Sequence, residues 1–303
     1  MNKHKRLIYK ALKNLKFLPK PLFFKIRYGA YTGKKLDLKN PVEFNAKIHW
    51  LKMYYHPPIL TQLADKYAVR AYVTEKIGAQ YLNELYGFYT RVDAIDFESL
   101  PNQFVMKAVQ GSSTNLIVKD KSHLNLEKTR KTLQSWMRHN QYQKVGFEWA
   151  YKHIKPGIII EKYLAEDDKN CLTDYKFACF NGKVKYVQVI LDNGDKVVQI
   201  FLDTEFNILE FNRINRESYE GKLQKPIEFD TMLYLAETLA DKLPYVRVDF
   251  YLVDNRIIFG EMTFYPGDGK HDFYPDIFNK INGEYLNLPF LMPGQREITT
   301  YES

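Results

Sequence analysis

The sequence predicts an α+β fold in which helices dominate the first part of the chain and antiparallel hairpins dominate the rest. Apolar residues recur at helical spacing in residues 41–60 and 63–82. From residue 171 onward, short β-branched and aromatic runs alternate with turn signals such as Asn181–Gly182, which favours a two-residue hairpin turn. At 303 residues the chain exceeds one ordinary domain and can bury a sizeable core.

The other predicted elements follow the same two patterns. Helical spacing predicts further helices at residues 124–140 and 232–243. Strand-like runs occupy residues 85–89, 104–109, 116–118, 157–164, 171–180, 183–191, 196–202, 206–211 and the hairpin 246–267. Residues after 273 are predicted to be mostly loop.

Composition excludes several classes of protein. The two cysteines, Cys171 and Cys179, lack the spacing of a zinc site or a disulfide framework, which suits a reducing, cytoplasmic compartment. No run of eighteen apolar residues exists, so no membrane-spanning segment is expected. Residues 41–303 sum to a charge of about −3, which argues against a nucleic-acid partner.

The first forty residues carry the basic excess of the chain. They hold twelve Lys and Arg and one acid, Asp37. Ile8, Leu12 and Leu15 follow helical spacing among lysines, which is typical of a basic amphipathic helix at an anionic membrane surface. The alternative is a helix that packs on the protein's own surface. Lysines at positions 10, 13 and 16 interrupt any apolar core and exclude a signal peptide.

The hairpin at residues 246–267 holds the most informative polar pattern. With a three-residue loop at 254–256, Asp249 faces Glu261 and Arg247 faces Thr263 on one side of the sheet. Two carboxylates so close need a cation between them, and hard oxygen ligands suit Mg²⁺. One alternative is a polar face that merely meets water. A two-residue turn would instead set Asp249 against Gly260.

A small-residue loop at 110–115 joins the predicted strands 104–109 and 116–118. Backbone N–H groups of a Gly/Ser loop can fold over phosphates, and Lys107 on the strand before it can reach a phosphate as a point charge. Gly and Ser are also ordinary hairpin residues, so this signal alone is weak. The chain has neither a GxxxxGK[ST] nor a GxGxxG motif.

Taken in order, these pieces resemble the ATP-grasp superfamily. The block from Arg247 through Asp249 to Glu261 is similar to the R-V-D-F…N-E-x-N-T-x-P-G signature of D-alanine–D-alanine ligases. More specifically, residues 40–290 resemble the TupA-like ATP-grasp proteins found among bacterial surface-polysaccharide genes. The segments that carry this resemblance are EFNAKIHWLK, LADKYAVRAYVTEKIG, IDFESLPNQFVMKA, LTDYKFACFNGK, VRVDFY and FGEMTF.

The resemblance implies a role for each matching residue. ATP would be bound by Lys66, Lys107, Gly111, Ser112, Ser113, Glu161, Lys162, Tyr163, Leu164 and Asp168. In that set the two lysines and the loop residues 111–113 would contact the phosphates. Residues 161–164 would contact the adenine, and Asp168 would contact the ribose. Two Mg²⁺ would be held by Asp249, Glu261 and Thr263. Lys176 would meet the γ-phosphate and Arg247 the acyl phosphate. Most relatives have Asn at the position of Thr263, so we expect the second Mg²⁺ to be held more weakly.

The resemblance also implies an architecture and an activity. Two α+β subdomains, at 102–164 and 165–303, would clasp ATP, after a basic helical region at 1–60 and a connecting segment at 61–101. The expected activity is ADP-forming ligation of a carboxylate to an amine through an acyl phosphate. The expected partners are a surface glycan or lipid-linked glycan precursor and an amino acid or uronic acid.

Two other functions remain open from the sequence. One is a sugar-nucleotide glycosyltransferase, although no two aspartates have the D-x-D spacing usual in that class. The other is a nucleotide-binding module without catalytic activity. The joint presence of Arg247, Asp249, Glu261 and Lys107 argues against such an inactive module. The expected location is the cytoplasm, with peripheral contact at the inner face of the membrane.

Overall fold

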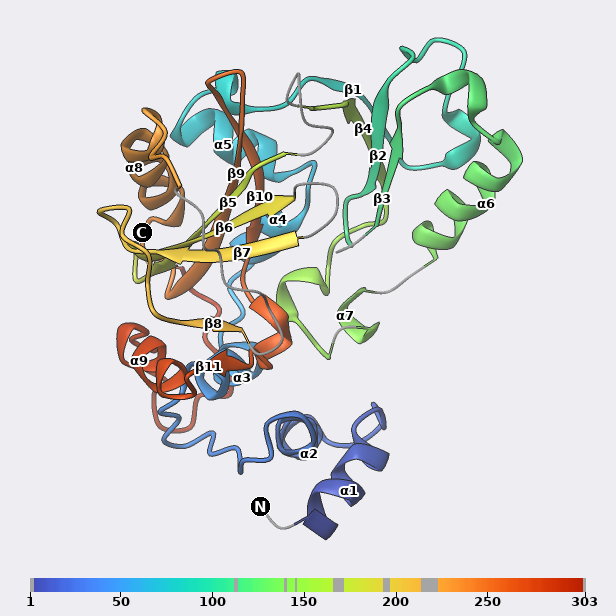
Figure 1. The fold of residues 1–303 in the computed structure, drawn as a ribbon. Helices are drawn as coiled ribbons and strands as arrows, with labels where there is room; N and C mark the ends of the chain where they lie inside the picture. Colours follow the sequence, from blue (N-terminus) through green and yellow to red (C-terminus); the bar gives the residue numbers. More distant parts are fainter. Residues whose placement is uncertain are drawn as a thin grey trace.

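Two antiparallel sheets form the centre of the protein, which confirms the predicted α+β class (Figure 1). The computed structural model describes residues 3–111, 114–138, 141–144, 146–165, 172–192, 197–213 and 223–301. Within these residues no helix is both long and apolar enough to cross a membrane.

The first sheet has four strands in the order β1-β4-β2-β3. Its strands are β1 (Leu85–Tyr89), β2 (Phe104–Ala108), β3 (Asn115–Val118) and β4 (Ile158–Lys162). Alternate residues such as Phe104, Met106 and Ile160 pack on one face against Leu133 of α6 (Leu126–Met137). The other face therefore carries Lys107 and Glu161. Strand β1 lies in the segment predicted to connect the subdomains, yet it pairs with β4 of this sheet.

The second sheet has five strands in the order β10-β9-β5-β6-β7. They are β5 (Asp174–Phe180), β6 (Lys183–Asp192), β7 (Val197–Leu202), β9 (Tyr245–Val253) and β10 (Arg256–Thr263). One face is apolar and packs Phe177, Val248 and Met262 toward α8 (Phe229–Ala240), whose inner side includes Leu235. The opposite face carries the polar residues of the predicted metal site.

The β9–β10 hairpin corrects the predicted loop. The turn has two residues, Asp254 and Asn255, with φ of 49° and 58°, rather than three. Val253 consequently pairs with Arg256 and not with Ile257. A β-bulge at Gly260 then shifts the register by one residue, so that Glu261 lies opposite Asp249 after all.

The β5–β6 hairpin has the same construction. Its predicted two-residue turn is present, with Asn181 and Gly182 at φ of 48° and 78°. The register then shifts between Ala178 and Cys179, so that Lys176 lies opposite Gln188 rather than Val187.

The helical part of the chain surrounds the second sheet and extends below it (Figure 1). Its helices are α1 (Lys3–Leu12), α2 (Lys20–Thr32), α3 (Phe44–Tyr54), α4 (Ile59–Ala64), α5 (Val69–Lys76), α7 (Gln141–Lys144) and α9 (Ile277–Tyr285). Single 3₁₀ turns occur at Ala79–Tyr81, Val92–Ala94, Lys121–His123, Trp149–Tyr151 and Pro266–Gly269, the last called η5. A short strand pair joins β8 (Asn212–Arg213) and β11 (Phe273–Tyr274).

Three predictions of local structure were wrong. The helix expected at 63–82 is divided, and Lys66 lies in the turn between α4 and α5 because the chain leaves the helix at Asp65. Residues 206–211 form no strand beyond an isolated bridge at Ile208, since Phe206 has a positive φ of 73°. The region after 273, expected to be loop, contains helix α9.

A buried carboxylate ties the N-terminal helices to the end of β10. Asp268 in η5 accepts hydrogen bonds from Arg27 of α2, at 2.9 Å from Nε, and from Lys52 of α3. Lys270 Nζ lies 3.0 Å from the same carboxylate. Burial raises the pKa of Asp268, but Lys52, Arg27 and Lys270 outweigh it and lower that pKa to about 2.

We predict that Asp268→Asn destabilises the fold strongly. Removing one partner leaves buried cations uncompensated, which costs about 3–5 kcal/mol in the free energy of unfolding. Urea denaturation at neutral pH measures this cost. The matched control is Asp276→Asn. Asp276 forms a surface ion pair with Lys34, and such a pair contributes at most about 1 kcal/mol to the free energy of unfolding. A loss of under about 1 kcal/mol for Asp268→Asn contradicts the prediction.

The same carboxylate should give the wild-type protein a pH dependence at low pH. Its folded pKa of about 2 lies below the unfolded value of about 3.9, so its contribution is complete above pH 4. That contribution is lost as the pH falls from about 4 to about 2. The Asp268→Asn variant should lack this part of the pH profile.

Candidate functional site

One face of the second sheet carries a row of polar residues across four adjacent strands. Cross-strand pairing places Gln188 of β6 beside Lys176 of β5, Lys176 beside Asp249 of β9, and Asp249 beside Glu261 of β10. The neighbouring row contains Arg247, which lies opposite Thr263. The structure therefore brings together all five residues predicted for the metal and catalytic groups.

Asp249 is the centre of this cluster. It is only 1% exposed, and its two oxygens accept hydrogen bonds from Arg247 at 2.7 and 2.6 Å. Lys176 Nζ donates to the same carboxylate at 2.8 Å. Burial lowers the pKa of Lys176, but Asp249 more than reverses this, and the pKa of the ammonium is raised. Both cations therefore stay charged at neutral pH.

Glu261 occupies the side of the cluster that faces the first sheet. Arg247 donates to it at 3.3 Å, Thr263 Oγ1 donates at 3.3 Å, and Lys66 Nζ lies 3.3 Å away. Burial raises the pKa of Glu261, but Lys66, Arg247 and Lys176 outweigh burial and lower that pKa to about 2. The carboxylate is ionised over the whole physiological range.

The oxygen atoms of this face fit Mg²⁺ in kind. Asp249, Glu261 and Thr263 offer two carboxylates and a hydroxyl, which are the hard ligands that Mg²⁺ prefers. In this structure the side chains of Arg247, Lys176 and Lys66 are the cations nearest to these oxygens. Within the described residues, no cluster of three or more His, Cys, Asp or Glu marks a metal site. The candidate metal ligands are therefore the two carboxylates and the hydroxyl. A bound metal ion would replace the side-chain cations that now contact these oxygens.

A second polar cluster faces Glu261 from the first sheet. Lys107 Nζ of β2 lies 2.8 Å from Glu161 of β4, and Arg70 of α5 lies 3.1 Å from the same carboxylate. These side chains line a pocket together with Lys66 and Gly260. The predicted nucleotide residues Lys66, Lys107 and Glu161 thus share one pocket between the two sheets.

Lys66 connects this pocket to the metal face. Its ammonium donates to the backbone carbonyl of Gly111 at 2.8 Å and lies 3.3 Å from Glu261. The predicted helix position was wrong, but the side chain is held in place by these two partners. Lys66 and Gly111 are therefore neighbours of the predicted metal ligands, although they are far from them in sequence.

The other predicted nucleotide residues are placed only in part. The carbonyl of Lys162 already accepts a hydrogen bond from Asn83 at 2.9 Å, which leaves one lone pair for a further donor. Lys119 Nζ lies 5.9 Å from the ring centroid of Tyr163. Leu164 is half-buried just after β4. Ser112, Ser113 and Asp168 lie outside the described residues.

Sequence reasoning missed two residues of this region. Arg70 pairs with Glu161, and its only signal was helical spacing from Lys66. Gln188 lies beside Lys176 only because of the bulge in the β5–β6 hairpin, and no turn or glycine signal marks that bulge in the sequence. Asp174 is the second acid that pairs with Lys176.

Asp174 is held in an unfavourable environment for a negative charge. Burial raises the pKa of Asp174 to about 6, the negative charge of Asp249 adds to the effect, and Lys176 opposes both. At neutral pH this carboxylate is ionised at a cost to the folded state.

We predict that Asp174→Asn stabilises the protein at pH 7. A carboxyl with a folded pKa near 6 and an unfolded pKa near 3.9 loses about 2–3 kcal/mol of stability at pH 7. The weakened Lys176 contact offsets about 1 kcal/mol, which leaves a gain of about 1–2 kcal/mol. The gain should be absent below pH 4 and should develop between pH 4 and 6. Chemical denaturation of both proteins across this range tests it, and a destabilised variant at pH 7 refutes it.

The chain is similar to several solved structures at low sequence identity. The solved structures that resemble this chain include D-alanine–D-alanine ligase from Bacillus anthracis complexed with ATP, at 16% identity and a TM-score of 0.40 over 69% of this chain and 58% of that one. Another is the ADP complex of N5-carboxyaminoimidazole ribonucleotide synthetase, at 12% identity and a TM-score of 0.41 over 69% and 46% of the two chains. A third is the ATP-grasp ligase PsnB with a precursor variant, Mg and ADP, at 10% identity and a TM-score of 0.40 over 76% and 60%.

The chain thus spans between 46% and 60% of the lengths of these three structures. Among proteins with curated descriptions, none matches. The model of the family described as TupA-like ATPgrasp matches residues 46–287, which is most of the 303-residue chain. The protein therefore belongs to the TupA-like ATP-grasp family.

Proposed function

We propose that the protein is an ATP- and Mg²⁺-dependent ligase that joins a carboxylate to an amine on a bacterial surface glycan or its precursor. The observation that carries this proposal is the row formed by Lys176, Asp249 and Glu261, which lies next to a pocket holding Lys66 and Lys107. A lysine and two neighbouring carboxylates lie side by side where a phosphoryl group and an acceptor carboxylate would have to meet.

The reaction joins two anions, so their repulsion must be screened. Lys66 and Lys107 would hold the phosphates of ATP. Two Mg²⁺ bound by Asp249, Glu261 and Thr263 would neutralise the charge that develops on the transferred group. The γ-phosphoryl group passes to a carboxylate oxygen, giving ADP and an acyl phosphate.

Arg247 and Lys176 stabilise the product of that first step. Arg247 is half-buried and keeps its charge, so it can hold an acyl phosphate and then the tetrahedral oxyanion. In the second step the amine nitrogen attacks the acyl carbon, the bond from that carbon to the phosphate oxygen breaks, and the nitrogen loses a proton. The products are an amide and inorganic phosphate.

A sugar-nucleotide glycosyltransferase is the second candidate. It would release a nucleoside diphosphate from a UDP-sugar and would need no acyl phosphate. The two neighbouring carboxylates of Asp249 and Glu261, with Lys176 beside them on the sheet face, favour phosphoryl transfer instead. A binding module without chemistry would have no need of Arg247, which holds Asp249, Glu261 and Thr263 together.

The ligase is tested by supplying ATP, Mg²⁺, a panel of carboxylates and either an amine or hydroxylamine, which converts an acyl phosphate to a hydroxamate. We expect ADP and phosphate release that depends on the carboxylate, and hydroxamate in the presence of hydroxylamine. Glu261→Gln should lower the rate at least about 100-fold, because the loss of about 2.7 kcal/mol or more of charge stabilisation has that effect. Release of UDP from a UDP-sugar, with no ADP from ATP, excludes the ligase.

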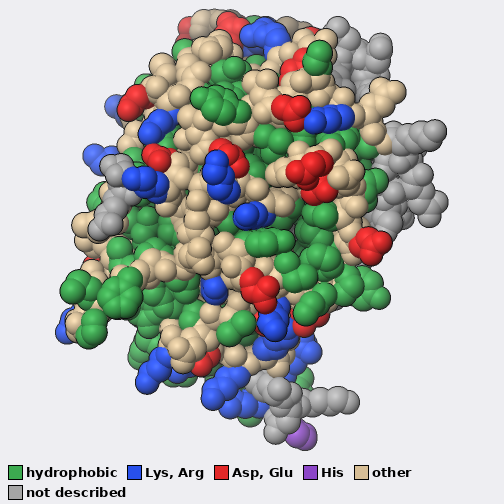
Figure 2. Space-filling view, turned by 90° about the vertical axis from the view of Figure 1, so that its left-hand side faces the viewer, with side chains coloured by type: hydrophobic (Ala, Val, Ile, Leu, Met, Phe, Trp, Pro, Cys, Tyr) green, Lys and Arg blue, Asp and Glu red, His purple; other side chains and the backbone are tan. Residues whose placement is uncertain are grey.

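We further propose that the N-terminal helices rest on an anionic membrane surface near the glycan. Helix α1 packs on α2 through Tyr9, whose ring lies against Gly29. The other side of α1 leaves Leu7 and Ile8 exposed at 64% and 57%, and Phe17 after it is 80% exposed. Figure 2 shows Lys and Arg side chains at this lower end of the molecule, where α1 and α2 lie in Figure 1. Apolar side chains among lysines match a lipid surface of negative charge.

We predict that Phe17→Ser weakens binding to anionic vesicles. Burying a phenylalanine in the lipid interface is worth about 1.5–3 kcal/mol, which corresponds to roughly 10-fold to 100-fold in the partition coefficient. Co-sedimentation with vesicles of phosphatidylcholine and phosphatidylglycerol measures it, and binding should fall as salt is added. Ile227→Ser is the matched control, since Ile227 is 89% exposed outside this surface. Equal binding of both variants and the wild type removes the membrane proposal and leaves the ligase proposal intact.

A further inference from the structure

A groove lies beside β7, the last strand of the second sheet, between that strand and the chain around β8. Figure 1 shows these two segments one below the other. The groove has a volume of about 390 Å³, which is within the range of small-molecule sites. Its walls are residues 199–201, residues 208–212 and the pair Tyr274 and Pro275. Three segments that are separate in the sequence therefore build one concave surface.

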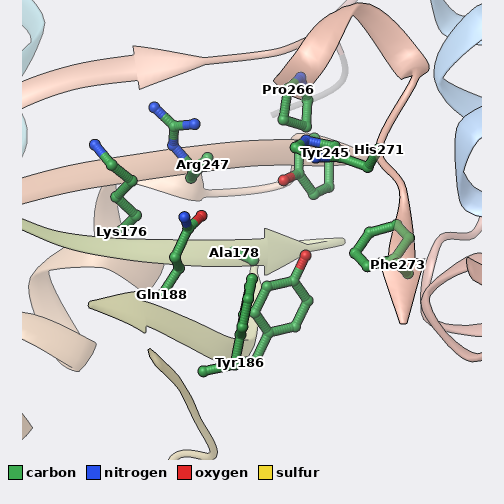
Figure 3. A pocket seen from close by; sticks show the side chains of 10 residues that line it. Lys176, Ala178, Tyr186, Gln188, Tyr245, Arg247, Pro266, His271 and Phe273 are labelled. Atoms are coloured by element: carbon green, nitrogen blue, oxygen red, sulfur yellow. The ribbon is translucent and has the colours of Figure 1, made fainter. Parts of the chain in front are cut away.

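The groove lies outside the reaction cluster, although both belong to the same sheet. Phe201 of the groove pairs with Gln188, Gln188 pairs with Lys176, and Lys176 pairs with Asp249. Neighbouring strands are about 4.8 Å apart, so Phe201 lies roughly 14 Å from Asp249. The pocket between them, beside Lys176 and Arg247 in Figure 3, has a volume of about 10 Å³ and holds about one water molecule. A ligand in the groove is therefore well separated from the reacting groups.

Gln199 is the buried polar residue in the wall of this groove. Only 5% of the residue is exposed, and its Nε2 atom has no hydrogen-bond partner among the described residues. A buried amide without a partner costs free energy on folding. The two ends of an amide change places by rotation about the last side-chain bond, so either end can be turned to a ligand. The amide therefore points to a ligand with groups that donate or accept hydrogen bonds.

The other walls of the groove are mostly apolar and aromatic. Tyr274 and Ile208 are 66% and 54% exposed. The ring of Phe211 packs on that of Phe201, with 4.4 Å between the centroids. Glu210 is exposed and is the only charged residue among the described residues of the lining. An aromatic face beside an amide and a carboxylate suits a sugar, because the ring can accept its C–H groups while the polar side chains bind its hydroxyl groups.

The same residues disfavour other classes of ligand. An anionic chain would bring its charge to Glu210, and no cation is among the described lining residues to offset the repulsion. A peptide strand that adds to β7 needs free backbone groups at its edge, but the carbonyl of Phe201 already accepts a hydrogen bond from Leu209 at 2.8 Å. A wholly apolar ligand would remove water from Gln199 and Glu210 without replacing its hydrogen bonds. A neutral ligand with hydroxyl groups avoids all three costs.

Resting on the proposed function, we propose that this groove binds neutral sugar units of the glycan substrate, away from its reacting end. A sugar ring packs on Tyr274, and its hydroxyl groups bond to Gln199 and Glu210. The bound units hold the glycan while its reacting group extends toward Asp249 and Glu261. No bond is made or broken in the groove, so its residues position the substrate and take no part in the chemical steps.

The test measures binding to the full-length protein by NMR titration. Neutral probes are maltotetraose, cellotetraose and N-acetylchitotetraose. Tetragalacturonate is the anionic probe, and a neutral peptide of threonine and valine represents an added strand. We expect a neutral tetrasaccharide to bind with a Kd at least about 10-fold lower than that of the anionic probe, equivalent to about 1.4 kcal/mol. Absence of binding by all three neutral probes, or tighter binding of the anionic probe or the peptide, overturns the proposal.

Two substitutions locate the binding site. Tyr274→Ala and Gln199→Leu should each raise the Kd of the bound tetrasaccharide at least about fivefold, equivalent to about 1 kcal/mol. Tyr234→Ala is the matched control, because Tyr234 is 70% exposed on α8, which packs on the opposite face of the sheet. If Gln199→Leu does not fold, Tyr274→Ala alone decides. An unchanged Kd in the folded groove variants, or an equal rise in Tyr234→Ala, overturns the assignment.

The titrations contain no ATP, so their result does not depend on the ligase reaction. Saccharide binding that the groove variants weaken supports this inference even if ADP release never depends on a carboxylate, and in that case only the ligase proposal fails. Carboxylate-dependent ADP release together with absence of saccharide binding has the opposite meaning. It leaves the ligase standing and overturns the groove.

Discussion

The buried carboxylate of Asp249 is the constraint around which the catalytic face is arranged. At 1% exposure it needs compensating charge, and Arg247 and Lys176 supply it from the same strand and from the neighbouring strand. Arg247 in turn donates hydrogen bonds to Glu261 and Thr263. A site of this kind is ordered before any ligand binds, because each charge has its partner within the sheet. Ligand binding then exchanges partners and does not have to assemble the groups.

Two β-bulges decide which residues reach that face, and the sequence could not reveal them. Opposed residues share a face, and a slip of one residue sends every later side chain to the other side. With regular two-residue turns, Gly260 would lie opposite Asp249 and Val187 opposite Lys176. The bulges replace these with Glu261 and Gln188. The pairing of Asp249 with Glu261 was therefore predicted correctly from a wrong turn, since a three-residue loop and a bulge displace the register equally.

The parts of the site that were predictable are those carried by local pattern. The strands predicted at 104–109 and 157–164 are β2 and β4, and they carry Lys107 and Glu161, which form an ion pair. Lys66 was misplaced because its position depends on tertiary contacts with Gly111 and Glu261, which local spacing does not encode. Helix α9 was missed for a related reason. Its buried polar residues Asn279 and Asn282 obscure the apolar period, although Asn279 is satisfied by Asn45 and Glu43 across the fold.

Buried ion pairs join the N-terminal helices to the strand that carries Glu261 and Thr263. Strand β10 carries Glu261 and Thr263 and leads within a few residues into η5, where Asp268 binds Arg27 of α2 and Lys52 of α3. Helix α1 packs on α2, so the exposed apolar residues of α1 are held at a fixed distance from the site. A membrane surface that binds α1 would therefore orient the catalytic face as well. Because the link is a set of buried ion pairs, binding of α1 to a membrane, as proposed, would set the height of this face above that surface.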